Sequence, residues 1–353
     1  MDAMTLLTAA AARDASDIFL VPGVDVSYKI KGRVVVNCEH KLQPKDIETM
    51  IAEIYTMAGN RSMTRVLETG DDDFSFSIVG FSRFRVNVFK QRGTIAAVIR
   101  VIPFALPDYR KLHIPDTVIG ISKLQRGLVL VTGPAGSGKS TTLACIINEI
   151  NATRSGHIIT LEDPIEYLHR HNKSIVTQRE IATDTDSYVA GLRAALRQVP
   201  DVILLGELRD YETMRIAMTA AETGHLVIST LHTVGVVNTI DRIIDAFPSN
   251  QQQQIRIQLS MVLQAVVSQQ LIPTEEGNAL PAYEMMFLNN ALRNMIRESK
   301  IHQMDAVIYS SREEGMVSMD ISLLNLFKEG KISKESALIY AANPDVLSKR
   351  MER

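Results

Sequence analysis

Residues 133–140 read Gly-Pro-Ala-Gly-Ser-Gly-Lys-Ser, and this octapeptide indicates the fold of the larger part of the chain. Its spacing matches G-x-x-x-x-G-K-[ST], the pattern of a P-loop. The glycines let the backbone turn so that its N–H groups face a phosphate, while the helix that follows points its positive end at the same place. An apolar run precedes the octapeptide and a helix-like run follows it, so we predict a nucleotide-binding loop between a strand and a helix.

The expected nucleotide ligands lie in this loop and at the start of the next helix. Lys139 can reach the β- and γ-phosphates, and the hydroxyl of Ser140 can hold Mg²⁺. The complete set of residues expected to bind the nucleotide is Gly133, Pro134, Gly136, Ser137, Gly138, Lys139, Ser140 and Thr141.

Beyond the loop, unbroken apolar runs alternate with helix-like stretches. The runs are residues 127–131, 158–161, 202–205 and 226–229, and the helix-like stretches are 141–150, 188–197 and 211–221. Unbroken runs indicate strands that are buried on both faces, as in a parallel sheet. Their alternation with helices predicts an α/β domain. From about residue 252 we expect mostly helix.

Polar side chains follow three of these runs. Gly206 stands after the run 202–205, where an Asp is usual, so Glu207 is the acid available there. It can hold the metal or orient the attacking water. Glu162, Asp163 and Glu166 follow the run 158–161 and could reach Mg²⁺ through water, although an acidic loop is often only solvated surface. His232 follows the longer run 226–231 and could sense the γ-phosphate, although a lone histidine is more often structural.

The first hundred residues predict a smaller α+β unit. Segments that alternate apolar and polar residues indicate half-buried strands, and a helical stretch opens at Pro44. The aspartates at 71–73 precede the strand that begins at Phe74. Arg83, Arg85 and Arg100 lie on predicted strands of this unit. They are either a solvated face or arginine fingers that act in another subunit.

Length and composition limit the number of domains and the classes of protein that this chain can belong to. The 353 residues suggest two domains, and 46% hydrophobic residues argue against disorder. Pro103, Pro107 and Pro115 suit a semi-rigid linker, with a boundary at about residue 105. We therefore expect domains at 1–104 and 117–353, joined by a linker at 105–116. No stretch is apolar enough to span a membrane, and no signal peptide is evident.

The two cysteines exclude a disulfide framework and a tetracysteine zinc site. We expect Cys38 and Cys145 to be buried thiols in a reducing cytosol, with one disulfide between them as the alternative. The formal net charge of −2 gives no basic excess for nucleic acid.

Four segments in order resemble the motifs of the secretion ATPase superfamily of type II and type IV systems. Residues 133–141 look like its Walker A motif, 160–166 like its Asp box, 206–210 like its atypical Walker B motif and 224–233 like its His box. The resemblance covers nearly the whole chain. It implies a PAS-like α+β N-terminal domain and a RecA-like P-loop ATPase domain with a helical C-terminal region.

Within that superfamily the chain most resembles the retraction ATPases of type IV pili, which drive twitching motility. Assembly-type secretion ATPases generally carry the tetracysteine zinc site that two cysteines cannot make. Residues 291–298, Ala-Leu-Arg-Asn-Met-Ile-Arg-Glu, resemble an element of the retraction ATPases. The accessory retraction ATPases match this element less well, and they remain an alternative together with the assembly type.

The resemblance also implies roles for the site residues. Glu207 would polarise the attacking water, Glu162 would support the metal or water network, and His232 would report the state of the γ-phosphate. Arg85 and Arg100 match positions that reach a nucleotide across a subunit boundary, with ATP and Mg²⁺ in the crevice between the two domains.

Further expectations concern the assembly and its place in the cell. They are a homohexamer, an inner-membrane pilus platform protein as partner, a paralogous retraction ATPase as a second partner, and a cytoplasmic location at the inner face of the membrane. Two departures are Phe19, where the family often has His, and Ala135, where Thr is usual.

Three other functions compete with this interpretation. A RecA-like nucleic-acid translocase needs a basic channel, often with stacking aromatic residues, and this chain has 5% aromatic residues and no tryptophan. A GTPase needs a guanine-reading N-K-x-D segment, and Asn172-Lys173 is followed by Ser174-Ile175 instead. A non-catalytic ring component would bind ATP without turnover.

Overall fold

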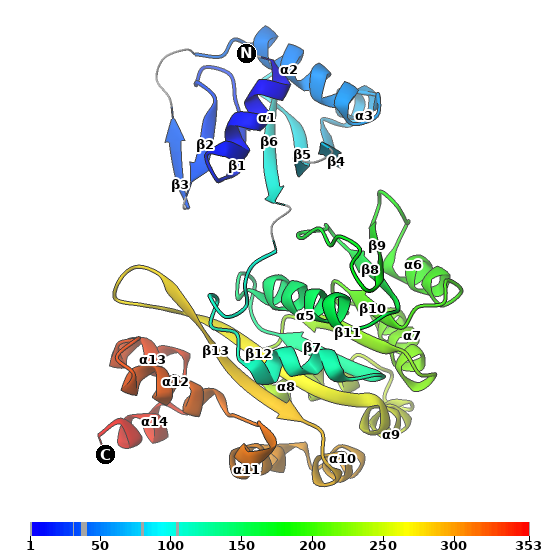
Figure 1. The fold of residues 1–353 in the computed structure, drawn as a ribbon, viewed down its shortest axis with the longest axis vertical. Helices are drawn as coiled ribbons and strands as arrows, with labels where there is room; N and C mark the ends of the chain where they lie inside the picture. The colour runs from blue at the N-terminus through cyan, green and yellow to red at the C-terminus, as the bar shows by residue number, and fades with distance from the viewer. Residues whose placement is uncertain (1, 31, 37–40, 79–80, 104–105, 353) are drawn as a thin grey trace. The chain divides into compact units, whose positions relative to one another are not determined.

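The computed structural model describes residues 2–30, 32–36, 41–78, 81–103 and 106–352 (Figure 1). The chain forms two compact units. One comprises Met1–Leu106 with Glu166–Leu168, and the other comprises Pro107–Ile165 with His169–Arg353. The predicted boundary at about residue 105 lies outside the described residues, as does Cys38. Cys145 is a buried free thiol.

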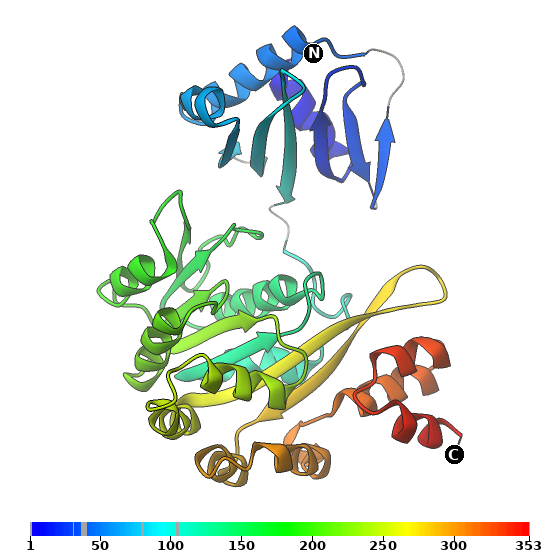
Figure 2. The same ribbon diagram turned by 180° about the vertical axis from the view of Figure 1, so that it is seen from behind.

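The smaller unit is a six-stranded antiparallel sheet with helices packed on it. Its strand order is β3-β2-β1-β6-β5-β4. Helices α1 and α2 pack against each other and against β6 (Figures 1 and 2). The elements are α1 (Ala3–Ala12), β1 (Ala15–Leu20), β2 (Ser27–Ile30), β3 (Arg33–Val36), α2 (Pro44–Met57), α3 (Thr64–Thr69), β4 (Asp71–Ile78), β5 (Ser82–Gln91) and β6 (Thr94–Pro103).

Strand β4 begins earlier than the sequence predicts, because its aspartates have partners in the fold. Asp72 is buried and accepts hydrogen bonds from Arg61 Nη2 at 2.8 Å and Tyr55 Oη at 2.9 Å. Asp73 pairs with Arg85 on the neighbouring strand. Burial by itself would raise the pKa of Asp72, but the hydrogen bonds from Arg61 and Tyr55 outweigh it and hold that pKa below its usual range.

The larger unit contains a seven-stranded sheet in the order β13-β12-β7-β11-β10-β8-β9. The four predicted strands are present and parallel to their neighbours, and the predicted α/β class is confirmed. The strands are β7 (Gly127–Thr132), β8 (His157–Glu162), β9 (Ile175–Glu180), β10 (Val202–Leu205), β11 (Leu226–Leu231), β12 (Leu263–Pro273) and β13 (Ala279–Phe287).

Helices cover both faces of this sheet, as its unbroken apolar runs require. Helices α4 (Asp116–Ile119) and α5 (Lys139–Thr153) contribute to the apolar cluster of one face. The cluster of the other face contains residues of α6 (Tyr188–Ala195), α7 (Tyr211–Glu222), α8 (Val236–Asp245) and α9 (Gln252–Val262).

The expectation of mostly helix from residue 252 is wrong for one segment. After α9, strands β12 and β13 form the long hairpin drawn in yellow in Figure 1, with β12 parallel to β7 and β13 antiparallel to β12. Its first strand is an 11-residue, mostly buried apolar run, and periodicity does not distinguish such a run from a buried helix.

The remainder of the chain is helical, as predicted. The helices are α10 (Asn290–Arg297), α11 (Met304–Ser310), α12 (Met319–Lys328), α13 (Lys334–Tyr340) and α14 (Pro344–Met351). Helices α12 and α13 pack against the hairpin (Figure 2). Within the described residues, no helix has the length and apolar character needed to cross a membrane.

We expect Asp72→Asn to destabilise the smaller unit by about 2 kcal/mol, because charged hydrogen bonds from Arg61 and Tyr55 are lost in a buried place. For a unit of this size that corresponds to a fall of roughly 10 °C in its melting temperature. Calorimetry of the full chain at pH 7 measures it.

Asp71→Asn is the matched control, because Asp71 is the exposed neighbour on the same strand. A carboxylate with a lowered pKa stabilises the fold above its unfolded pKa and loses that effect as the pH falls through its folded pKa. The difference between wild type and Asp72→Asn should therefore shrink below about pH 4. Equal melting of the two variants at pH 7 would contradict the prediction.

Candidate nucleotide-binding site

The predicted site residues gather along one edge of the larger sheet. Strands β7, β11, β10 and β8 are neighbours and parallel, so their carboxyl ends meet there. The P-loop follows β7, His232 follows β11, Glu207 follows β10, and Glu162 ends β8. At about 4.8 Å between strands, Glu207 starts about 10 Å from the P-loop strand and Glu162 about 14 Å from it.

The P-loop lies directly on strand β12. Gly133 has φ +140°, and a Cβ there would lie 2.1 Å from the backbone oxygen of Gln269. Gly138 has φ +86°, and a Cβ there would lie 2.9 Å from Gln269 Nε2. Only glycine therefore fits at position 133, for reasons of both conformation and space.

The loop carries the donors that a phosphate needs. Lys139 Nζ donates to the carbonyl oxygens of Gly133 and Pro134, each at 2.8 Å, so the ammonium group already lies over the loop. Helix α5 begins at Lys139 with Gly138 as its N-cap, and no side chain caps it. The hydroxyl of Ser137 is buried without a hydrogen-bond partner. A bound phosphate would satisfy this hydroxyl and the first N–H groups of α5, so the loop fits the phosphates of a nucleotide.

Gln269 is a site residue that the sequence analysis missed. Its Oε1 accepts a hydrogen bond from Thr142 Oγ1 at 2.7 Å, which ties β12 to the first turn of α5. Ser268, Gln269 and Gln270 are all buried. Three consecutive polar residues inside an apolar run were the available signal, because buried polar side chains need specific partners.

Glu207 and His232 are brought together as the strand-end pattern predicts. Glu207 Oε2 lies 3.3 Å from His232 Nε2, and its Oε1 accepts from Arg209 Nε at 2.6 Å. The Glu207 side chain is only 9% exposed, whereas Arg209 is 71% and His232 57% exposed. The hydrogen bond from Arg209 to this carboxylate raises the pKa of Arg209. A nearly buried carboxylate with exposed partners can thus turn toward a ligand at the sheet edge.

Glu162 is held within the sheet. Its Oε1 accepts from Thr160 Oγ1 at 2.6 Å and from Gln178 Nε2 at 3.2 Å. Asp163 and Glu166 are exposed. In the described part of the chain, no three His, Cys, Asp or Glu side chains lie close enough together to hold a metal ion. A Mg²⁺ ion at Ser140 would therefore take phosphate oxygens and water as its other ligands.

The arginines of the smaller unit lie side by side. Arg85 on β5 and Arg100 on β6 are direct cross-strand partners. Arg85 Nη2 pairs with Asp73 Oδ2 at 2.6 Å, and Arg100 Nε pairs with Asp17 Oδ1 at 3.1 Å. Arg83 donates to Ser77. Each arginine thus has a polar neighbour within its own unit, and the carboxylates of Asp73 and Asp17 balance the charges of the adjacent pair.

Helix α10 shows how the segment 291–298 is built. Leu292 and Ile296 are buried, while Arg297 is exposed. Arg293 is half-buried, and its Nη1 donates to Ser260 O at 2.5 Å and Met261 O at 3.2 Å. Arg293 therefore satisfies the last carbonyl groups of α9, which is a structural role.

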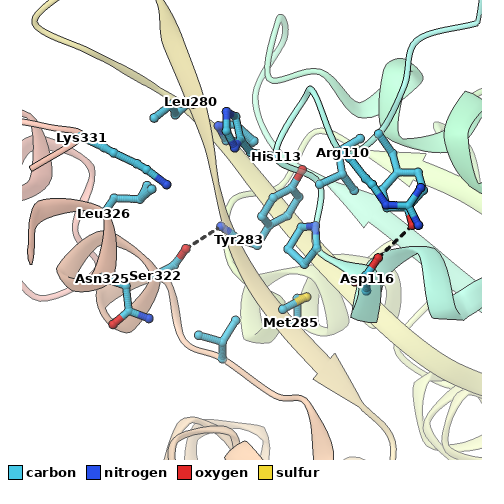
Figure 3. Close-up of a pocket in the computed structure, with 15 residues that line it drawn as sticks. Arg110, His113, Asp116, Leu280, Tyr283, Met285, Ser322, Asn325, Leu326 and Lys331 are labelled. Atoms are coloured by element: carbon cyan, nitrogen blue, oxygen red, sulfur yellow. Dashed lines mark hydrogen bonds between the residues drawn. The ribbon is translucent and has the colours of Figure 1, made fainter. Parts of the chain in front are cut away.

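Two neighbouring cavities lie beside the hairpin, and one of them adjoins the P-loop. One, of about 470 Å³, is lined by Gly138, Thr141 and Thr142 together with Gln269 and Tyr283. The other, of about 540 Å³, lies beyond it and is drawn in Figure 3. Both are within the size range of small-molecule sites.

Residues His113 and Tyr283 line both cavities. In Figure 3, Tyr283 stands between the Arg110–Asp116 segment on one side and Ser322, Leu326 and Lys331 on the other. Its backbone N–H donates to Ser322 Oγ at 3.1 Å. The first cavity is the one that reaches the P-loop and so could take the non-phosphate part of a nucleotide.

Comparison with known proteins confirms the expected resemblance. A family model described as "Type II/IV secretion system protein" matches residues 2–318. The type IV pilus retraction ATPase PilT of Pseudomonas aeruginosa is 43% identical over 321 residues, which are 91% of this chain and 92% of PilT. The type IV pilus ATPase PilU of the same organism is 38% identical over 321 residues, 91% of this chain and 83% of PilU.

A solved structure resembles the whole chain. The crystal structure of the pilus retraction motor PilT with bound ADP superposes with a TM-score of 0.91 at 44% sequence identity, covering 99% of both chains. Since the family model spans residues 2–318 of 353, and relatives of the same kind cover nine-tenths of the chain, the protein belongs to the type II/IV secretion system protein family.

Proposed function

We propose that this chain is a motor ATPase that hydrolyses ATP to drive the retraction of type IV pili, and hence twitching motility. One observation carries the proposal: the P-loop and the Glu207–His232 pair share one sheet edge, in a chain that is 43% identical to PilT over nine-tenths of its length. The structural similarity to PilT with bound ADP supports the choice of nucleotide.

The P-loop binds the phosphates of ATP. Lys139 turns from the loop carbonyl groups to the β- and γ-phosphates, and the Ser137 hydroxyl donates to a phosphate oxygen. When bound, Mg²⁺ would neutralise charge on the transferring phosphoryl group, held by Ser140 directly and by Glu162 and Glu207 through water. The pocket beside Gly138 accepts the rest of the nucleotide.

Glu207 polarises the attacking water. Because Glu207 is nearly buried, its negative charge acts on the water more strongly than it would in bulk solvent, where electrostatic interactions are weaker. Arg209 and His232 contact one carboxylate oxygen each. His232 is 57% exposed, which leaves its ring room to turn from Glu207 to a γ-phosphate and so to report whether that phosphate is present.

The working form is a homohexameric ring in which Arg85 and Arg100 act on the nucleotide of a neighbouring subunit. Their adjacency on β5 and β6 supports this role, since two guanidinium groups side by side suit a polyphosphate. The residues 105–116 would be the linker about which the 1–104 and 117–353 domains rotate. This rotation turns an inner-membrane platform protein.

The protein would accordingly work in the cytoplasm at the inner face of the membrane, with a paralogous retraction ATPase as a possible second partner. An accessory role of the PilU kind is the alternative, because PilU is 38% identical over the same share of the chain.

We expect Glu207→Ala to lower ATP turnover by at least a hundredfold and to leave nucleotide binding largely intact. The fold should survive, because the partners that Glu207 leaves behind, Arg209 and His232, are exposed to solvent. Phosphate release and the binding of a fluorescent ADP analogue measure the two effects. Glu275→Ala, in the exposed hairpin turn, is the control. Substantial turnover by Glu207→Ala would remove this residue from its role.

Two inactive variants should complement each other if subunits share sites. Arg85→Ala leaves the P-loop intact, and Lys139→Ala leaves the arginine intact. We expect each alone to be nearly inactive and a mixture of the two to recover part of the wild-type turnover in mixed rings. Recovery as a function of mixing ratio is measured by phosphate release. No recovery in rings shown to contain both variants would place Arg85 outside the neighbouring site.

Deletion of the gene in its host distinguishes retraction from assembly. A retraction motor predicts surface pili that persist while twitching is lost, because pili still grow but cannot be withdrawn. Electron microscopy and a twitching assay give the two readouts, and re-expression of the wild-type gene is the control. Loss of surface pili would indicate an assembly ATPase, and normal twitching an accessory role.

A further inference from the structure

Tyr188 reaches the end of strand β10 from a neighbouring helix. It is the first residue of α6, whose N-cap Ser187 accepts a hydrogen bond from Ala190 N. The Tyr188 hydroxyl oxygen lies 2.6 Å from the position that a Cβ atom on Gly206 would occupy. Since real Cβ atoms do not approach other heavy atoms so closely, any side chain at position 206 would require the phenol to move.

Gly206 cannot move away from this phenol. Its N–H donates to Leu161 O at 2.8 Å, and its carbonyl oxygen accepts from Thr230 Oγ1 at 2.6 Å. These bonds fasten the end of β10 to both neighbouring strands. The backbone of Gly206 lies outside the positive-φ region, so the reason for glycine here is space and not conformation.

Two acidic residues lie beside this position: Glu207 follows Gly206 in the chain, and Glu162 Cα is 3.4 Å from the same Cβ position. Burial and the nearby charges of Glu207, Asp163 and Glu162 raise the pKa of Tyr188, so the phenol stays neutral and keeps its proton. A carboxylate at position 206 would repel Glu207, whereas a phenol can donate a hydrogen bond to a carboxylate or a water.

We propose that Tyr188 is a positioning residue for Glu207. Its hydroxyl stands in the space of the strand-end Asp that other P-loop NTPases use, and it holds the carboxylate or its water in the orientation for attack. The inference rests on the proposed ATPase function and adds a residue to that site.

Tyr188→Phe removes only the hydroxyl and tests the role directly. We expect kcat for ATP to fall about tenfold, while KM stays within twofold and the melting temperature within about 2 °C of wild type. A tenfold loss corresponds to one charged hydrogen bond of about 1.4 kcal/mol. Tyr211→Phe is the matched control: Tyr211 is also the first residue of a helix, α7, but its ring packs against Phe247.

A second pair of variants tests the steric part. In Gly206→Ala the new methyl group meets the hydroxyl, so stability and kcat should both fall. In the double variant Gly206→Ala/Tyr188→Phe the next nearest atoms, Glu162 Cα at 3.4 Å and Leu161 O at 3.5 Å, leave ordinary contacts. We expect its melting temperature to return to that of Tyr188→Phe, while kcat remains at the level of Tyr188→Phe.

Two outcomes would overturn the inference. One is a Tyr188→Phe variant whose kcat equals that of wild type. If both values are well above that of Glu207→Ala, the proposed ATPase function remains intact and only the role of Tyr188 is lost. The other is a double variant that is no more stable than Gly206→Ala. Absence of turnover in the wild-type protein would instead contradict the proposed function and, with it, the role given to Tyr188.

Discussion

The contact between the P-loop and strand β12 is the constraint on which the site depends. The backbone oxygen of Gln269 lies where a Cβ on Gly133 would be, and its side chain accepts from Thr142 at the start of α5. The loop is therefore shaped by a strand that follows it by more than a hundred residues. A phosphate cradle needs its N–H groups fixed before the ligand arrives, and a hydrogen-bonded central strand is a rigid backing for them.

The same hairpin also holds the segment after His232. Ser268 Oγ accepts from Gly235 N at 2.9 Å, and Glu284 Oε1 accepts from Val236 N at 2.7 Å, at the start of α8. Burial raises the pKa of Glu284, and the helix terminus gives its carboxyl group a partner. On its other side the hairpin bonds to the C-terminal helices through Ser322 and Tyr340. One hairpin thus connects the segment after His232 with the C-terminal helices.

The sequence predicted those features that short segments determine on their own. The P-loop spacing, the unbroken apolar runs and the polar residue after each run placed Glu207, His232 and Lys139 on one sheet edge, because parallel strands bring their carboxyl ends together. Strand β12 was missed because a buried strand and a buried helix share the same apolar composition. The partners of Arg85 and Arg100 depend on strand register, and Tyr188 meets Gly206 only after α6 and β10 have packed, so no spacing in the sequence reveals either.

Two glycines of the site show why one feature could be predicted from the sequence and another could not. Gly133 is required by its backbone conformation and by a carbonyl group of a central strand, and no side-chain substitution removes a carbonyl group. Gly206 is required only by the hydroxyl of one tyrosine. The first requirement follows from the backbone of the fold, and the P-loop motif predicts it. The second depends on one side chain of α6, so the residue at the end of β10 can change when the residue at position 188 changes. The glycine at the strand end, where other P-loop NTPases carry an acid, thus fits the packing of α6 against β10.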